Sequence, residues 1–227
     1  MSLAQRLQSV QADIADAARA SGRQPDEITT IVVTKFHPAS LVRDLYDLGV
    51  RNVGENRHQE AEAKSAELSS LEGLTWHFIG QLQSNKAKAA RAYSSVVHSV
   101  DSAKLARTLA AAEPGPVDVL DCFVQLNLTN DPGRGGVQPS DALQLAELIA
   151  AEESLNLLGV MAVAPLDEEP RSAFARVREV SERVRTLIPT AHYISAGMSH
   201  DFADAIAEGA THLRIGSAIT GERPPAG

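Results

Sequence analysis

Strand-like and helix-like segments alternate about eight times along this 227-residue chain, and no other feature of the sequence limits its fold as strongly. Short runs of β-branched and apolar residues are each followed by a longer stretch whose apolar residues recur at helical spacing. Alternation of this kind is typical of parallel strands joined by right-handed helical crossovers. The predicted strands cover residues 31–34, 51–54, 76–80, 95–98, 119–128, 156–161, 192–195 and 211–215.

Eight strand–helix units in a chain of this length favour one domain over residues 1–227, a single (β/α)8 barrel of the α/β class. Such barrels commonly occupy about 200 to 250 residues. A doubly wound open sheet is the alternative. Only about a dozen residues follow the last predicted strand, so we expect an extra N-terminal helix, residues 2–20, to cover the resulting gap in the barrel wall. The Gly-rich segment 129–136 is interpreted as a mobile loop over one barrel end.

Charge and cysteine content exclude several classes of protein. The net charge of −8 disfavours nonspecific nucleic-acid binding. Cys122 is the only cysteine, so neither an intrachain disulfide nor a multi-thiolate zinc site can form. The histidines lack the paired spacing of metal ligands, and no run reaches the roughly 18 apolar residues of a membrane span. We expect a cytoplasmic protein without a metal or a membrane partner, as a monomer or a weak dimer.

The first predicted strand ends in Lys35, directly before a turn that contains Pro38. A lysine at this place is either a solvated loop charge, the common case, or a partly buried amine that can attack a carbonyl. When a barrel closes, its first strand lies beside its last. Lys35 is therefore expected to face the loops that follow the seventh and eighth strands.

The seventh and eighth predicted strands both run into small, hydroxyl-bearing loops that contain glycine. The first loop holds Ser195, Gly197 and Ser199, and the second holds Gly216 and Ser217. In barrels of this type these two loops and a helix N-terminus often bind a phosphate, and Ser199 is interpreted as the start of such a helix. Helix capping and a turn glycine explain either loop alone about equally well, whereas two such loops at both expected places favour phosphate.

One ligand could meet both the phosphate loops, at Gly197 and Gly216, and the amine of Lys35. A phosphorylated aldehyde satisfies both requirements, and pyridoxal 5'-phosphate is the common biological example. An aldolase that forms a Schiff base with a sugar phosphate is a weaker alternative.

Several motifs carry a family resemblance. The stretches VVTKFHP, VGENRHQE, WHFIGQLQSNK and SAGMSHDFADAIAEGATHLRIGSAITG, and more loosely LLGVMAV, resemble the pyridoxal phosphate homeostasis protein family. Its members are fold type III barrels similar to the N-terminal domain of alanine racemases, without a C-terminal β domain. The resemblance implies a Schiff base between pyridoxal phosphate and Lys35, with Arg214 facing the pyridine nitrogen. It further implies cofactor contacts from Asn56, Ser195, Gly197, Met198, Ser199, Gly216 and Ser217.

Two functions agree with this resemblance: a cofactor-binding homeostasis protein that buffers pyridoxal phosphate for apoenzymes, and an enzyme such as an amino-acid racemase. Racemisation needs an acid or base on each face of the substrate. Tyr193 is the only tyrosine predicted on a strand face with Ser195, and no further domain is expected to exclude water. Arg214 has only donors to offer, so it should keep the ring nitrogen unprotonated and weaken the cofactor as an electron sink. We therefore expect a protein without catalytic residues.

Overall fold

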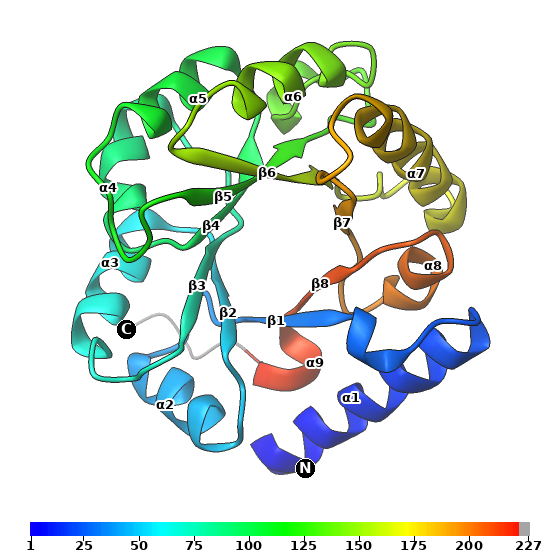
Figure 1. The fold of residues 1–227 in the computed structure, drawn as a ribbon. Coiled ribbons are helices and arrows are strands. Elements are labelled where there is room, and N and C mark those ends of the chain that lie inside the picture. Colours follow the sequence, from blue (N-terminus) through cyan, green and yellow to red (C-terminus); the bar gives the residue numbers. More distant parts are fainter. Residues whose placement is uncertain (223–227) are drawn as a thin grey trace.

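The computed structural model describes residues 1–222, and within them eight parallel strands form a closed barrel in which each strand pairs with the next and β8 pairs with β1 (Figure 1). The predicted (β/α)8 barrel is confirmed, and the open-sheet alternative is wrong. The strands are β1 Thr29–Val33, β2 Asn52–Glu55, β3 Thr75–Phe78, β4 Val96–Val100, β5 Leu120–Gln125, β6 Leu155–Met161, β7 Tyr193–Ser195 and β8 His212–Ile215.

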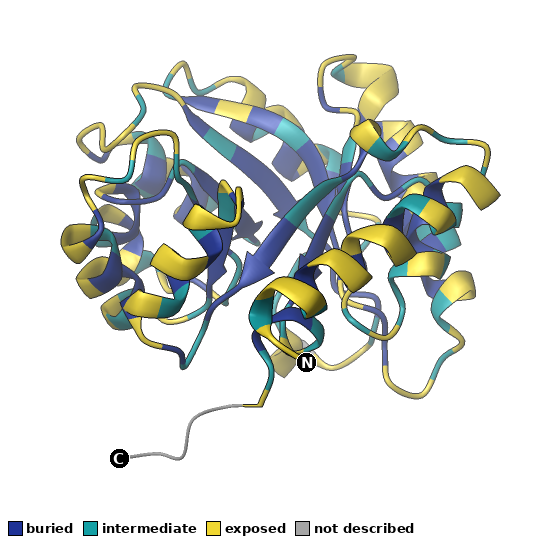
Figure 2. Ribbon diagram, turned by 90° about the horizontal axis from the view of Figure 1, so that it is seen from below, coloured by how far each residue is buried: buried dark blue, intermediate teal, exposed yellow. Residues whose placement is uncertain are grey.

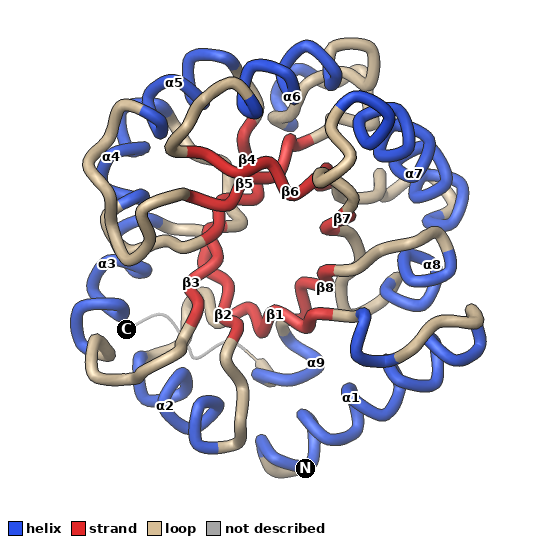
Figure 3. The backbone as a smooth tube through the Cα atoms, viewed as in Figure 1, coloured by secondary structure: helices blue, strands red, loops and turns tan. Residues whose placement is uncertain are grey.

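Helices form the outer ring around these strands (Figure 3). They are α1 Leu3–Ala20, α2 Ala39–Asp47, α3 His58–Glu67, α4 Ala87–Arg91, α5 Ala103–Ala110, α6 Ala142–Ala150, α7 Pro170–Leu187, α8 Phe202–Ala207 and α9 Ser217–Thr220, with 3-10 turns η1 Pro25–Glu27, η2 Ser84–Lys86 and η3 Pro132–Arg134. Figure 2 shows the buried strands between helices that expose their outer faces. The main apolar core therefore lies between the strands and the helix ring, as in other barrels of this class.

A second, smaller apolar cluster lies inside the barrel. It consists of Val96, Phe123 and Met161, with Leu158 and Tyr193 packed against it. Several other buried side chains are polar, and three of the strands each contribute a histidine that joins hydrogen bonds or ring contacts there: His77, His98 and His212. The barrel interior thus combines a small apolar cluster with a polar network.

Helix α1 covers the gap in the helix ring, as predicted. It begins at the capping box of Ser2 and Gln5, and its inner face buries Leu7, Val10 and Ile14. It packs beside the single turn of α9 (Figure 1). The guanidinium of Arg6 donates from Nε to the carbonyl of Ile219 at 2.7 Å and reaches the carbonyl of Thr220 at 3.5 Å. Because the last carbonyls of a helix lack intrahelical partners, this arginine fastens the end of α9 to α1.

The strand predicted over residues 119–128 is shorter in the structure, because β5 ends at Gln125. The chain then pairs with its own return segment: Val137 donates its amide to the carbonyl of Gln125 at 2.9 Å, and Asn127 donates to the carbonyl of Val137 at 2.8 Å. The predicted loop 129–136 is therefore anchored at its base, with η3 at its tip.

Replacing Arg6 by alanine should lower the free energy of unfolding by about 1.5 kcal/mol, because carbonyls at the end of α9 lose a charged donor. The matched control on the same helix is Arg19→Ala, since Arg19 pairs with Asp16 and both side chains are largely exposed. We expect a change of about 0.5 kcal/mol or less for the control. Urea unfolding curves measure both variants, and equal losses would show that Arg6 does not fasten α9.

Candidate functional site

A cavity of about 390 Å³ opens at the carboxyl ends of the strands. Seven of the nine predicted site residues line it together, namely Lys35, Asn56, Met198, Ser199, Arg214, Gly216 and Ser217. They come from the segments that follow β1, β2 and β7 and from β8 and its following turn. Residues from both ends of the sequence therefore meet in one place, which is the position where barrels of this class bind ligands.

Strand β1 ends one residue earlier than predicted, so Lys35 is the second residue after the strand rather than the first. Strand β1 ends at Val33, although the amide of Thr34 still donates to the carbonyl of Gly54 at 3.0 Å. The next residue after Lys35, Phe36, has a φ of 68°, a left-handed conformation that is uncommon for a residue other than glycine. The Phe36 amide donates to a carboxylate oxygen of Glu60 at 3.0 Å. Strained backbone of this kind persists only where its surroundings hold it, and here it presents the lysine to the cavity.

A buried ion pair supports this turn from behind. The Lys64 ammonium donates to Glu55 Oε1 at 2.6 Å and to the carbonyl of Thr34 at 2.9 Å. The Thr34 hydroxyl donates to the same Glu55 oxygen at 2.6 Å. Burial raises the pKa of Glu55, and the hydrogen bond from Lys64 opposes that rise. The residue directly before Lys35 is thus held by groups on β2 and α3.

Arg214, on β8, lies at the floor of the cavity and is almost completely buried. Its Nη1 donates to the hydroxyl of Ser195 at 2.5 Å, and its Nη2 donates to the carbonyl of Ala162 at 2.8 Å. Burial lowers the pKa of Arg214 to about 10, while the charge of Asp201 acts in the opposite direction. The guanidinium therefore remains charged at neutral pH in a fixed orientation.

The loop after β7 differs from the prediction in two respects. Ser195 does not line the cavity, because its fully buried hydroxyl lies behind Arg214 and bonds to Arg214 and His98. Ser199 does not begin a helix: α8 begins at Phe202, after the N-cap Asp201. The carboxylate of Asp201 accepts the amide of Met198 at 2.5 Å and closes a turn before the helix. Ser199 still lines the cavity, but from this turn.

Gly197 also lies outside the cavity lining, and its own packing explains the glycine. Its φ is 95°, and a Cβ at this position would lie 2.8 Å from Cβ of Ala205 on α8. By contrast, a Cβ on Gly216 would make only ordinary contact, 3.6 Å from Val33. Gly216 and Ser217 lie at the start of α9 and face the cavity. They offer backbone amides and a hydroxyl to an anion.

The residues present fit a polar ligand with a ring and an anionic group. The buried Oδ1 of Asn56 has no hydrogen-bond partner among the described residues, and Asn56 lines the cavity. Gly80 allows Asn56 this place, since a Cβ on Gly80 would lie 2.3 Å from the Asn56 carbonyl oxygen. An amine from Lys35, an acceptor from Asn56, a fixed cation at Arg214 and the Gly216–Ser217 turn thus surround one space.

The cavity residues that were not among the predicted site residues include two histidines, His37 and His200. His37 follows Lys35 by two positions in the same turn, so its proximity to the lysine could have indicated it. His200 lies in the turn after β7, next to Ser199.

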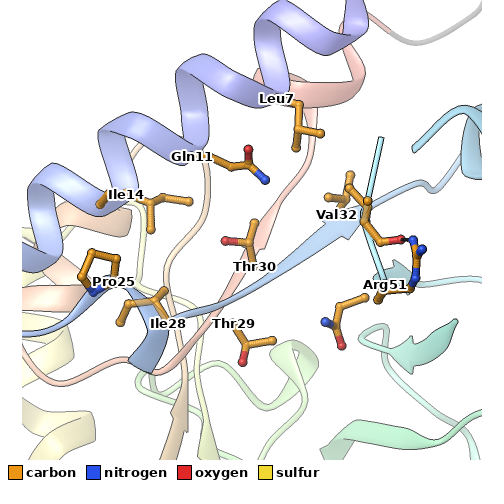
Figure 4. A pocket seen from close by; sticks show the side chains of 13 residues that line it. Leu7, Gln11, Ile14, Pro25, Ile28, Thr29, Thr30, Val32 and Arg51 are labelled. Atoms are coloured by element: carbon orange, nitrogen blue, oxygen red, sulfur yellow. Dashed lines mark hydrogen bonds between the residues drawn. The ribbon is translucent and has the colours of Figure 1, made fainter. Parts of the chain in front are cut away.

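A second cavity, of about 430 Å³, lies outside the barrel wall under α1 (Figure 4). Leu7, Gln11 and Ile14 point from α1 toward β1, and Arg51 lies at the other side. The Arg51 guanidinium already donates to the carbonyls of Tyr46 and Val50 and stacks 3.8 Å from the Tyr46 ring. The cavity under α1 thus offers few groups for chemistry, and the candidate site is the one at the barrel mouth.

Three histidines inside the barrel are held neutral by burial. Burial lowers the pKa of His77 to about 3 and that of His212 to about 4, and it lowers the pKa of His98 well below its usual value. His77 is a hydrogen-bonded residue of the barrel interior, with bonds to His98 at 2.9 Å and to Asn52 at 3.0 Å. Within residues 1–222 no group of three or more metal-ligating side chains is present.

Comparison with known proteins shows similarity along almost the whole chain. The alanine racemase N-terminal domain family matches residues 6–224. The pyridoxal phosphate homeostasis protein of Corynebacterium glutamicum is 40% identical over 222 residues, covering 95% of this chain and 99% of the relative. No helix in the described part of the chain is long and apolar enough to cross a membrane.

Solved structures agree with the sequence relatives. PipY of Synechococcus elongatus PCC7942, in a structure with PLP bound, has 34% identity and a TM-score of 0.84, covering 97% of this chain and all of PipY. An alanine racemase from Corynebacterium glutamicum has a TM-score of 0.70 at 14% identity, covering 97% of this chain and 63% of the racemase. The racemase comparison shows a shared fold alone.

The buried histidines predict a loss of stability in acid. Unfolded histidines bind protons below about pH 6.5, whereas these remain neutral in the folded state down to much lower pH. For each one, stability is therefore full above pH 6.5 and is lost as the pH falls. His212→Gln should flatten the dependence between pH 6.5 and 4 by up to about 1.4 kcal/mol per pH unit. Urea unfolding at a series of pH values measures this.

The control for this measurement is His192→Gln, because His192 is an exposed histidine next to β7. It should leave the pH dependence unchanged. Identical slopes for the wild type and both variants would show that His212 is protonated in the folded state as readily as in the unfolded chain.

Proposed function

We propose that this chain, which belongs to the pyridoxal phosphate homeostasis protein family, binds pyridoxal 5'-phosphate at the barrel mouth. In this role it takes part in the intracellular homeostasis of pyridoxal phosphate. The observation that carries this proposal is the cavity in which Lys35, Arg214 and the Gly216–Ser217 turn face one space. An amine for the aldehyde and a small-residue turn for the phosphate lie on neighbouring strand ends. PipY, a relative of the same fold, has a structure with PLP bound.

Four of the cavity residues are assigned to the aldehyde and the phosphate. Lys35 supplies the amine for a Schiff base with the aldehyde. The backbone of Gly216 and the hydroxyls of Ser217 and Ser199 bind the phosphate. When bound, the cofactor supplies a reactive aldehyde and an electron-withdrawing ring.

The ring nitrogen and the ring edge are assigned to two further residues. Nη1 and Nη2 of Arg214 donate to Ser195 and Ala162, which uses two of the five N–H groups of the guanidinium and leaves the others, Nε–H among them, for the pyridine nitrogen. A guanidinium has no acceptor, so it favours an unprotonated ring nitrogen. The unpaired oxygen of Asn56 would accept a hydrogen bond from a hydroxyl group on the ring, and Met198 would form an apolar wall beside the ring.

We further propose that the protein holds the cofactor without enzyme-like turnover and passes it to apoenzymes in the cytoplasm. None of the three tyrosines lines the cavity. The hydroxyl of Tyr46 donates to the carbonyl of Glu72, Tyr93 is buried at the end of α4, and Tyr193 packs inside the barrel against the His212 ring at 5.3 Å. Tyr193, the tyrosine considered from the sequence as a second base, therefore lies away from Lys35.

Covalent attachment to Lys35 is tested by borohydride reduction of the protein loaded with pyridoxal phosphate, followed by peptide mass mapping. The reduced adduct is expected on Lys35, because Lys35 is the lysine that lines the cavity. Lys35→Ala should remove the adduct but keep part of the affinity through the phosphate turn, since the two contacts are separate. Lys88→Ala, an exposed lysine on α4, is the control and should change neither. An adduct found mainly on Lys86 or Lys88 would contradict the assignment.

Absence of turnover is tested by incubating the loaded protein with L- and D-amino acids and, separately, with an apo-aminotransferase. We expect amino-acid conversion no faster than in the Lys35→Ala variant, together with activation of the apo-aminotransferase. His37→Gln and His200→Gln show whether either cavity imidazole acts as a base. Rapid conversion that disappears in Lys35→Ala or in a histidine variant would identify an enzyme instead.

A further inference from the structure

A continuous row of hydrogen-bonded side chains crosses the barrel interior from the cavity floor to the far side. It begins at Arg214, whose Nη1 lies 2.5 Å from Ser195 Oγ. The Ser195 hydroxyl lies 2.8 Å from Nδ1 of His98, and Nε2 of His98 lies 2.9 Å from Nδ1 of His77. Nε2 of His77 lies 3.0 Å from Oδ1 of Asn52. Strands β8, β7, β4, β3 and β2 each contribute one member.

The direction of these hydrogen bonds can be worked out from the Arg214 end. A guanidinium can only donate, so Ser195 accepts from Arg214. The single hydroxyl proton of Ser195 then needs an acceptor, and among the described residues its other partner is Nδ1 of His98. A neutral imidazole with an accepting Nδ1 carries its proton on Nε2. His98 therefore donates to Nδ1 of His77, which must in turn carry its own proton on Nε2.

The same direction follows independently from the opposite end. Asn52 presents its carbonyl oxygen, Oδ1, to Nε2 of His77, and an oxygen can only accept there. His77 must therefore donate from Nε2 and accept at Nδ1. In the reverse arrangement His98 and Arg214 would both donate to Ser195, whose own proton would remain buried without an acceptor, an unfavourable state.

We propose that Arg214, Ser195, His98, His77 and Asn52 form a hydrogen-bond chain of one fixed direction, in which His98 and His77 are positioning residues for the Arg214 guanidinium. The ring of His98 is held in its plane by Phe123, whose centroid lies 4.6 Å away at 22°. Because both imidazoles are neutral, they do not repel the positively charged guanidinium of Arg214. The hydrogen-bond chain does not rest on the proposed function. Its effect on the pyridine nitrogen of the cofactor does rest on it.

The charged and titratable groups around His98 are consistent with a neutral ring. His77 on β3 and His212 on β8 lie near it, with ring centroids at 5.2 Å and 6.4 Å, and Arg214 lies beyond Ser195. The nearest charge in this group is positive, so protonation of His98 would place two cations on either side of one hydroxyl. The far end of the chain, Asn52, is half-buried and also borders the cavity under α1.

The first test uses the unloaded protein and nitrogen NMR of ¹⁵N-labelled histidines. We expect His77 and His98 as neutral Nε2–H tautomers at pH 7 and still at pH 5. Ser195→Ala removes the donor to His98, so His98 should lose its single tautomer. Asn52→Asp keeps an acceptor for His77 and should retain the pattern, whereas Asn52→Leu should lose it. An Nδ1–H tautomer or a doubly protonated ring at either histidine of the wild type would overturn the proposal.

The second test measures positioning through Arg214 itself. Rotation of its guanidinium, followed by NMR of the arginine side chain, should become roughly tenfold faster in Ser195→Ala and also faster in His98→Phe. His98→Gln, which can accept and donate at corresponding places, should restore slow rotation. His192→Gln is the control at an exposed site. Unchanged rotation in both Ser195→Ala and His98→Phe, in variants that remain folded by circular dichroism, would exclude the positioning role.

Loading with pyridoxal phosphate separates this inference from the proposed function. If the cofactor binds, Ser195→Ala should shift its visible absorbance band while the borohydride adduct stays on Lys35. If the cofactor does not bind but the tautomers of His77 and His98 are as expected, the proposed function fails and the hydrogen-bond chain stands. A band that is identical in wild type and Ser195→Ala would show that the chain does not affect the ring.

Discussion

The pairing of β1 with β8 is the constraint on which the site depends. The register places Ile31 beside Arg214 and Val32 beside Ile215, so the residues just beyond β1 lie next to those just beyond β8. Lys35 and the Gly216–Ser217 turn are distant in sequence and become neighbours only because the barrel closes. The cavity at the strand ends is thus a product of closure, and a sheet left open at this seam would separate the amine from the turn.

Much of the fold and part of the site could be predicted from the sequence, because both follow from local periodicity and strand ends. The alternation predicted the barrel, and the strand-end position of Lys35 placed it in the cavity. The structure differs from the expectation where a residue's depth matters. Ser195 is the last residue of β7, and strand periodicity gives its face but not its distance from the mouth, so its bond to Arg214 could not be foreseen. The predicted start of α8 at Ser199 was wrong, because the carboxylate of Asp201 accepts the amide of Met198 and closes a turn before the helix begins.

The polar interior required three-dimensional information for a related reason. His77 and His98 lie on neighbouring strands, and each residue alone is ambiguous between a buried hydrogen-bonded group and a ligand. Only the stacking of side chains from five strands shows that the two imidazoles and Ser195 satisfy one another. A partly satisfied network at this depth would destabilise the barrel, so its members depend on each other in a way that no single sequence motif displays.

The attachment of α9 to α1 connects the N-terminal helix to events at the barrel mouth. The turn of Gly216 and Ser217 begins α9, and the other end of that single helical turn is held by Arg6. A ligand that orders the first residues of α9 therefore also favours the docked state of α1, and the reverse is equally true because such coupling is reciprocal. Hydrogen exchange in the first helix should accordingly slow when an anion occupies the cavity, so that the N-terminal segment reports on occupancy at a site it does not touch.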